Sequence, residues 1–417
     1  MKSKEVIFLA IVTLYIAYLI IPIFMYVSRL NISMVCIVTT ISIFVLYPKC
    51  FFNKVAYAGL VYLTILFLYY LAGKHLPVFG TGDFPDLVRL MMATAFVLPN
   101  LAIAFVMNSL NSKVIYGYVA FSSLVLLFLS FISFTPLIIN DASILRLITT
   151  TNQNIYIDPR LPHYSLLHAY IMLLPVILLG FKVKKDKLRW FFLFTSLYLV
   201  YVILQSSIVT ILVLTFIVII IMLSYNPLME KRSVIRALGI VLVALLVIES
   251  GVLSLIMENL VSYYDDTASA SKMRYFRDLI AGNQVEAGNS MEQRDNLHQM
   301  SIDSFIENPL FGGGKEGSHS SLLDRLGAVG LVGFVPYLVF LYSIVITTLH
   351  SFINRQSKIT FLIVVFCAFM LLYTKGIFGQ ECWLFFIVLA PAVLHYLELD
   401  KHKKNGKTPS SISHIKQ

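Results

Sequence analysis

Long apolar runs recur along almost the whole chain and are separated by short polar segments. The runs cover residues 6–27, 32–47, 55–73, 89–108, 114–139, 164–181, 190–205, 207–224, 237–257, 321–349, 359–374 and 379–398. A helix needs about 20 apolar residues to cross a bilayer, and inside lipid it satisfies its own backbone hydrogen bonds. The pattern therefore predicts an all-α polytopic membrane protein with about 12 transmembrane helices.

The composition supports a membrane protein and argues against several other classes. Hydrophobic residues make up 58% of the chain and charged residues 13%, whereas about one quarter of a soluble domain is charged. The four cysteines form no CxxC pair, so a cysteine-based metal site is not expected. The net charge of +10 is typical of basic cytoplasmic loops in a polytopic protein, and we expect no nucleic-acid partner.

The orientation and the division of the chain follow from the loops. The first run, 6–27, is too long for a cleavable signal peptide and is interpreted as a span. With the N-terminus in the cytoplasm, most of the 32 Lys and Arg residues lie on the inner side, so both termini are predicted to be cytoplasmic. The predicted parts are helices 1–9 in 1–257, a large extracytoplasmic loop in 258–320, helices 10–12 in 321–400 and a disordered basic tail in 401–417.

The large loop is predicted to contain two short helices, one over 269–282 and one over 290–309. Leu297, Met300, Phe305 and Ile306 give the second helix an approximately helical apolar face. The loop is therefore expected to form a small helical cap on the outer surface of the membrane.

The end of this loop carries a distinctive motif. "ENPLFGGG" begins at Glu307, and "SHSSLLDRLGAVGLVG" ends at Gly333. The motif resembles the signature of the O-antigen ligase and polymerase superfamily, and is most similar to Wzy-type polymerases of O-antigens, capsules and exopolysaccharides. The resemblance implies a GT-C-like membrane glycosyltransferase that needs no cofactor and no metal. Its partners would be glycans on undecaprenyl pyrophosphate, membrane lipid and a chain-length regulator, at the outer face of the bacterial inner membrane.

Such a polymerase transfers the growing glycan from its lipid pyrophosphate to the next lipid-linked repeat unit, with inversion. The leaving diphosphate develops negative charge, which arginine can bind bidentately. Arg160 and Arg294 resemble the two loop arginines of the family. The predicted pyrophosphate-binding residues are Arg160, Arg294, Arg274, Arg277 and Lys315. For Arg160 and Arg294, an interfacial anchor or lipid-headgroup contact remains the alternative, and for Arg274 and Arg277 the alternative is that one of them faces solvent on a loop helix.

The acceptor hydroxyl needs a base, and the resemblance assigns that role to His319, at the start of the tenth span. A helix start favours the neutral imidazole, which can accept a proton. Asp324 either orients His319 or forms a structural salt bridge. Glu249, in the ninth span, either pairs with an arginine of the loop or acts as a second acid or base.

Three glycines at 327, 330 and 333 predict a strip of small residues that lets membrane helices approach closely. Two other functions remain open. A ligase would use the same site with a lipid or protein acceptor. A flippase or transporter is less favoured, because transporters place polar groups near the midplane of the bilayer, whereas these polar groups gather at the outer surface.

Overall fold

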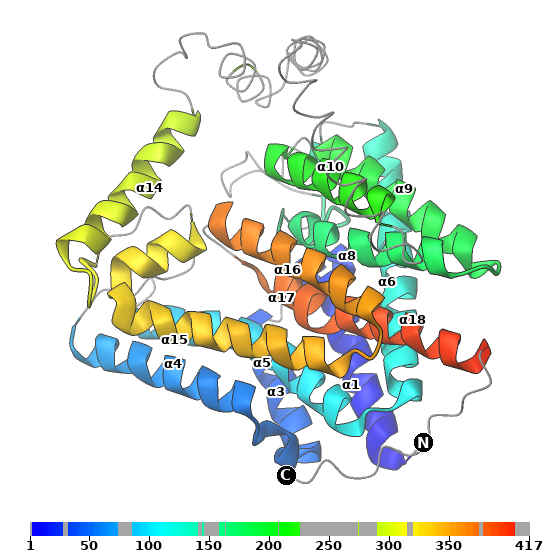
Figure 1. Cartoon of the computed structure of the whole chain (residues 1–417), viewed down its shortest axis with the longest axis horizontal. Coiled ribbons are helices and arrows are strands. Elements are labelled where there is room, and N and C mark those ends of the chain that lie inside the picture. The colour runs from blue at the N-terminus through cyan, green and yellow to red at the C-terminus, as the bar shows by residue number, and fades with distance from the viewer. Residues whose placement is uncertain are drawn as a thin grey trace.

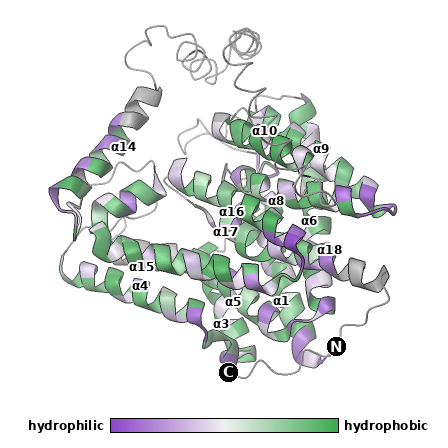
Figure 2. Cartoon of the chain, viewed as in Figure 1, coloured by the Kyte–Doolittle hydropathy of each residue, from purple (hydrophilic) through white to green (hydrophobic). Residues whose placement is uncertain are grey.

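The computed structural model describes residues 2–27, 32–73, 86–140, 144–145, 158–162, 164–206, 208–225, 274, 290–314, 320–374 and 378–404. Within these ranges the regular structure is entirely helical (Figure 1). Apolar residues cover the helices of the bundle, whereas helix α14 (Ser290–Glu307) is mixed in character (Figure 2).

Eight helical segments of the described part are long and apolar enough to span a membrane. They are α1 (Ser3–Ile20), α4 (Lys54–Leu71), α6 (Lys113–Asn140), α8 (Tyr164–Val183), α9 (Leu188–Ser206), α15 (Ser321–Ser351), α16 (Arg355–Thr374) and the segment Gln380–Glu398. That last segment contains α17 (Gln380–Leu384), the π-helical turn η2 (Phe385–Leu389) and the start of α18 (Ala390–Lys404). The prediction of a polytopic α-helical membrane protein is confirmed to this extent.

Shorter apolar helices account for three more predicted runs. They are α3 (Ile32–Leu46), the segment Phe96–Leu110 of α5 (Asp86–Leu110) and the segment Thr210–Ser224 of α10 (Val209–Ser224). The remaining short helices are α2 (Pro22–Val27), η1 (Pro48–Phe51) and α14 (Ser290–Glu307). The predicted run 237–257 lies outside the described residues.

Helix α15 covers the predicted run 321–349, but it is broken at Gly330. Gly330 has φ 54° and ψ −164°, and it separates Ser321–Val329 from Leu331–Ser351. A positive φ of this size favours glycine, which has no Cβ to clash. Figure 1 shows the consequence, because the yellow first part and the gold second part of α15 run in different directions.

Helix α14 confirms the predicted second helix of the large loop, but its predicted apolar face is wrong. Among the side chains of α14 that the structure describes, Ser301 and Ser304 are buried, whereas Met300 and Ile306 are exposed. The reason is close approach, because a Cβ at Gly327 of α15 would lie 2.5 Å from the carbonyl oxygen of Ser301. Only small side chains fit at such a contact, so the helix buries its serines.

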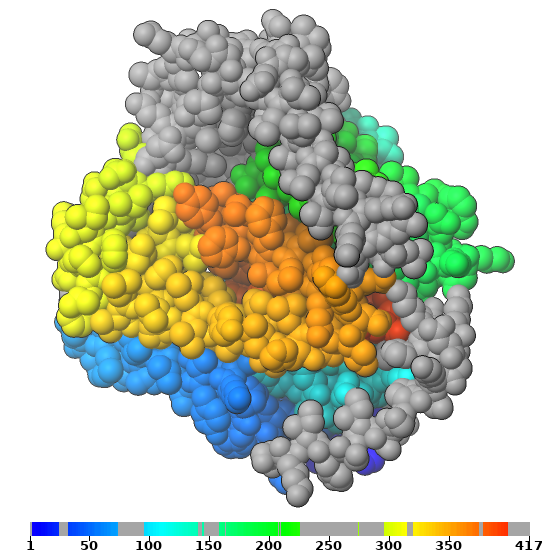
Figure 3. Space-filling model, viewed as in Figure 1, coloured from blue at the N-terminus to red at the C-terminus, as the bar shows by residue number. Residues whose placement is uncertain are grey.

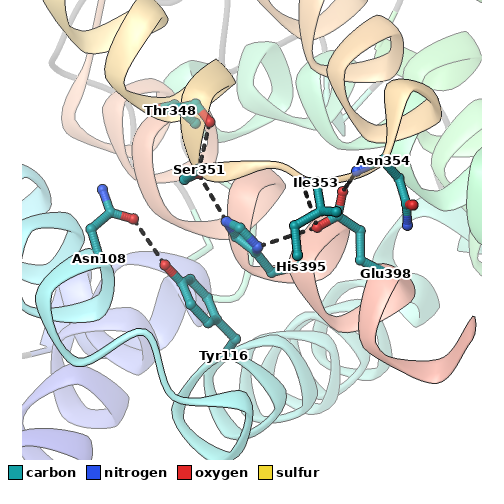
Figure 4. Close-up of polar contacts among 8 residues, drawn as sticks. All are labelled: Asn108, Tyr116, Thr348, Ser351, Ile353, Asn354, His395 and Glu398. Atoms are coloured by element: carbon teal, nitrogen blue, oxygen red, sulfur yellow. Dashed lines mark hydrogen bonds and ion pairs between the residues drawn. The ribbon is translucent and has the colours of Figure 1, made fainter. Parts of the chain in front are cut away.

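A polar network lies at the end of the bundle that contains His395, which we call the His395 end (Figure 4). The Glu398 carboxylate accepts hydrogen bonds from the backbone N–H groups of Ile353, at 3.4 Å, and Asn354, at 2.8 Å. His395 Nδ1 lies 3.6 Å from Glu398 Oε2, and its Nε2 lies 3.0 Å from Ser351 Oγ. The network ties the loop between α15 and α16 to α18.

Candidate functional site

The structure places only part of the predicted site. Asp324 and Arg160 are described with their side chains, and Arg274 is described as a single exposed residue. Arg294 lies in α14, but its side chain is outside the described part. The predicted residues that lie outside the described residues altogether are His319, Glu249, Arg277 and Lys315.

Asp324 caps the start of α15. Its Oδ2 accepts a 3.0 Å hydrogen bond from the backbone N–H of Ser320, and the Ser320 hydroxyl oxygen accepts a 3.2 Å hydrogen bond from the N–H of Leu323. This reciprocal arrangement satisfies N–H groups that a helix start leaves without partners. The buried carboxylate therefore holds the backbone of the residue that directly follows His319 in the sequence.

The same carboxylate joins α15 to α14. Asp324 Oδ1 accepts a 2.8 Å hydrogen bond from the Ser301 hydroxyl, and the Ser304 hydroxyl donates a 3.0 Å hydrogen bond to the Gly327 carbonyl. Both contacts advance in the same direction along the two helices, so α14 and the first part of α15 run parallel, as Figure 1 also shows. The starts of the two helices therefore lie at the same end of the pair.

Arg294 lies seven residues before Ser301, which is about two helical turns. Its position in the chain is thus about two turns nearer the start of α14 than the contact between Ser301 and Asp324. The sequence treated Arg294 and His319 as two motif residues in one loop. With Ser301 beside Asp324 and Ser304 beside Gly327, the start of α15 at Ser321 is level with about residue 298 of α14, so Arg294 lies about one further turn toward the start of α14.

The glycine turn between the two helices pairs with the break in α15. The N–H groups of Leu331 and Val332, which a straight helix would bond internally, donate instead to the carbonyls of Pro309, at 2.9 Å, and Leu310, at 3.0 Å. The Gly327 carbonyl, freed by the same break, accepts from the N–H of Gly313 at 3.0 Å. Irregular backbone at membrane depth needs such partners.

The predicted strip of glycines on one continuous helix face is therefore wrong at Gly330. Gly330 is not helical, and a Cβ there would lie 2.5 Å from the backbone nitrogen of Gly312. Gly327 contacts the backbone of Ser301. These two glycines pack the first part of α15 against α14 and its turn, not against another span.

Arg325 and Tyr69 fasten the folded-back first part of α15 to its neighbours. The Arg325 guanidinium donates a hydrogen bond to the Tyr62 hydroxyl of α4, and its Cζ lies 4.2 Å from the centroid of the Tyr337 ring. Tyr337 belongs to the second part of α15, so this contact crosses the break at Gly330. The Tyr69 hydroxyl donates a 2.8 Å hydrogen bond to the Val329 carbonyl beside that break. Arg325 thus acts in structure, by hydrogen bonding and cation–π contact.

Arg160 is engaged by a neighbouring acid. Its Nε lies 3.0 Å from Asp158 Oδ1 and its NH2 nitrogen lies 2.7 Å from Asp158 Oδ2, a bidentate pair near the protein surface. The hydrogen bonds from Arg160 lower the pKa of Asp158 below its ordinary value of 3.8. A diphosphate that binds Arg160 would have to compete with this carboxylate.

A buried carboxylate that the sequence reading overlooked, Glu381, lies at the start of α17. It is completely buried, accepts a hydrogen bond from the Ser165 hydroxyl in the first turn of α8, and accepts a 2.9 Å hydrogen bond from the Gln380 amide. A Cβ at Gly379 would lie 2.7 Å from Ser165 Cβ, so α8 and α17 approach closely there. The signal was available, because an acid inside an apolar run is costly and seldom idle.

Glu381 and the polar contacts of Asp324 lie at one end of the bundle, which we call the Glu381 end. The ring centroids of His298 on α14 and Tyr373 at the end of α16 are 6.1 Å apart, and Tyr373 precedes Glu381 by only eight residues in the sequence. Ser165 follows Arg160 by five residues. The segments with Arg160 and Glu381 are therefore linked through Ser165, and α14 contacts the end of α16 that leads to Glu381.

Comparison with known proteins adds no relative to this picture. No family model matches the chain, and no curated protein matches it.

Proposed function

We propose that the chain is a membrane glycosyltransferase of the Wzy polymerase type, which joins oligosaccharide repeat units carried on undecaprenyl pyrophosphate. The observation that carries the proposal is the motif from Glu307 to Gly333 together with the parallel packing of its two helices. The resemblance assigns roles to both Arg294 and His319, and the parallel packing supports the proposal because the N-terminal part of α14 and the start of α15 lie at the same end of the pair.

In the proposed reaction, the bond between the anomeric carbon of the growing glycan and its diphosphate breaks. A hydroxyl of the next repeat unit forms the new glycosidic bond at that carbon, with inversion. His319 accepts the proton of the hydroxyl, and the leaving undecaprenyl pyrophosphate takes the bonding electron pair. Arg294 and Arg160 stabilise the negative charge on the diphosphate, as preorganised cations do in many enzymes.

The proposal includes the finer architecture and location. It takes the run 237–257 as a further span, which with the helices of the described part gives 12 spans in a GT-C-like arrangement. The Glu381 end then faces away from the cytoplasm of a bacterial inner membrane, and both termini lie inside, as the distribution of Lys and Arg favours. A chain-length regulator would be the protein partner.

Deletion of the gene, followed by gel analysis of surface glycolipids, tests the proposal. A polymerase predicts that single repeat units still reach the surface while the long ladder disappears. Long chains that remain on the carrier lipid would instead indicate a ligase, and repeat units that accumulate inside would indicate a flippase. A ladder unchanged by the deletion would refute all three.

Single substitutions then test the site. His319→Ala and Arg294→Ala are expected to abolish the ladder at normal membrane levels of the protein. His350→Ala and Arg355→Ala are matched controls, because both residues are exposed at the His395 end of α15 and α16. Wild-type ladders in both site variants would refute the assignment of His319 and Arg294. They would not refute the proposed polymerase activity itself.

A further inference from the structure

The turn that joins α14 to α15 exposes large apolar side chains. Ile306 is 65% exposed, Leu310 57% and Phe311 46%. They lie at the end of a helix that also exposes the polar residues Gln299, Asp303 and Glu307. A soluble loop seldom presents three large apolar side chains so close together, and such patches mark contact surfaces.

The depth of this turn is fixed by its hydrogen bonds to α15. Pro309 and Leu310 accept from the N–H groups of Leu331 and Val332, the first two residues of the second part of α15. Leu331–Ser351 is about 31 Å long at 1.5 Å per residue. That length matches the roughly 30 Å hydrocarbon core of a bilayer. With Ser351 at one boundary, Leu331 and its two partners lie at the other.

Helix α4 gives the same depth independently. It begins at Lys54, beside the capping side chain of Asn53, and it ends at Leu71, which is 63% exposed. Tyr69, two residues before the end, contacts the Val329 carbonyl at the break in α15. In Figure 3 the yellow atoms at the lower end of α14 are continuous with the gold surface of α15 and the blue surface of α4.

We propose that the turn Asn308–Phe311, together with Ile306, dips into the hydrocarbon edge of the leaflet at the Glu381 end, with lipid acyl chains as its partner. The polar face of α14 stays in the headgroup layer and the water above it. The loop is thus anchored in the membrane at its far end and does not simply lie on the surface, as the sequence had suggested. This inference needs no enzymatic activity and stands apart from the proposed function.

Tryptophan fluorescence in proteoliposomes tests the anchor. The two native tryptophans, at 190 and 383, are replaced in a W190F/W383F background, and Phe311→Trp is added. Vesicles contain phosphatidylcholine with or without bromine at carbons near the headgroup end of the acyl chain. Asp303→Trp on the exposed polar face of α14 is the matched control.

The expected result is that the tryptophan at 311 emits at short wavelength and loses most of its intensity in brominated vesicles, while the one at 303 emits as in water and keeps its intensity. Equal, unquenched emission from both would overturn the proposal, and so would short-wavelength emission at 311 that bromine leaves unchanged. If Phe311→Trp aggregates, Leu310→Trp replaces it. Photolabelling of the unsubstituted protein by diazirine lipids must also mark the peptide that contains Leu310 and Phe311, and its absence there would equally refute the anchor.

Discussion

Asp324 accepts a 3.0 Å hydrogen bond from the backbone N–H of Ser320, and this single contact connects a buried carboxylate to the residue beside His319. A second oxygen of the same side chain holds Ser301 of α14. The sequence left Asp324 undecided between orienting His319 and forming a salt bridge. The geometry gives it a third role, in which it holds the backbone N–H of Ser320 and joins α15 to α14.

Substitution of Asp324 separates these roles. Asp324→Ala removes the cap and is expected to cost about 1 kcal/mol of stability and most of the polymer, because the start of α15 loosens. Asp324→Asn keeps one acceptor oxygen and should retain much of the stability and much of the polymer. Ladder length and thermal unfolding in detergent are the measurements. Ser301→Ala is the control for the interhelical bond alone, and an unaltered ladder in Asp324→Ala would show that the cap is dispensable.

The close contact at Gly327 gives a prediction on stability. A methyl group at this position would meet the Ser301 carbonyl at 2.5 Å, so α14 must move away from α15. Overpacking of this kind costs about 1–3 kcal/mol, and Gly327→Ala should lower the unfolding temperature and shorten the ladder. Gly117→Ala is the matched control, since its new methyl would lie 3.7 Å from the nearest side-chain atom. Equal unfolding temperatures for the two variants would contradict the contact.

The spans could be predicted from sequence because each depends on a local property, the length of an apolar run. The break at Gly330 could not, because its energy depends on hydrogen bonds to a turn about 20 residues earlier in the chain. The buried face of α14 was misread for a related reason. Hydropathy ranks Ser301 and Ser304 as polar, yet backbone contact with Gly327 selects for small size and not for apolarity.

The candidate site was predictable where residue chemistry is unusual in its setting. Asp324 stood out as a charge inside an apolar run, and Glu381 met the same criterion but was overlooked. The pairing of Arg160 with Asp158 was not foreseen, although the two are separated only by Pro159. Which of several nearby acids an arginine contacts is a matter of loop conformation, and no spacing rule decides it.

The pair between Asp158 and Arg160 predicts how substrate competes for the arginine. Asp158→Asn removes the charge that holds the guanidinium, so half-maximal inhibition by free inorganic pyrophosphate should need less pyrophosphate than in the wild type. The assay is polymer formation by purified protein in vesicles. Asp186→Asn, in the loop between α8 and α9, is the control for a surface charge. Unchanged inhibition in Asp158→Asn would mean that Arg160 does not bind the diphosphate.

The direction of the pKa shift sets the pH range of this effect. The pKa of Asp158 is lowered, so the stability of the pair is fully present above the ordinary value of 3.8 and is lost as pH falls through the lower folded value. Between about pH 5 and pH 8 Asp158 stays ionised. Inhibition by pyrophosphate should therefore differ between wild type and Asp158→Asn by a constant factor over this range. If the difference in inhibition between wild type and Asp158→Asn vanishes within this pH range, the charge of Asp158 is not what competes with pyrophosphate.

Substitution of Glu381 tests whether this buried carboxylate acts only in the fold or also in the site. Glu381→Ala leaves the half-buried Ser165 hydroxyl and the buried Gln380 amide without their acceptor. An unsatisfied buried donor costs about 1–3 kcal/mol, so the variant should unfold at lower temperature and the start of α8, which follows Arg160, should shift. Glu381→Gln keeps an acceptor oxygen and should restore most of the stability.

If the carboxylate only joins α8 to α17, Glu381→Gln should also restore the ladder, whereas a stable Glu381→Gln variant without polymer would assign its charge to the site. Glu398→Gln, a buried acid at the His395 end, is the matched control and should lower stability without abolishing polymer. Equal loss of polymer in Glu381→Gln and Glu398→Gln would show that both act only through the fold.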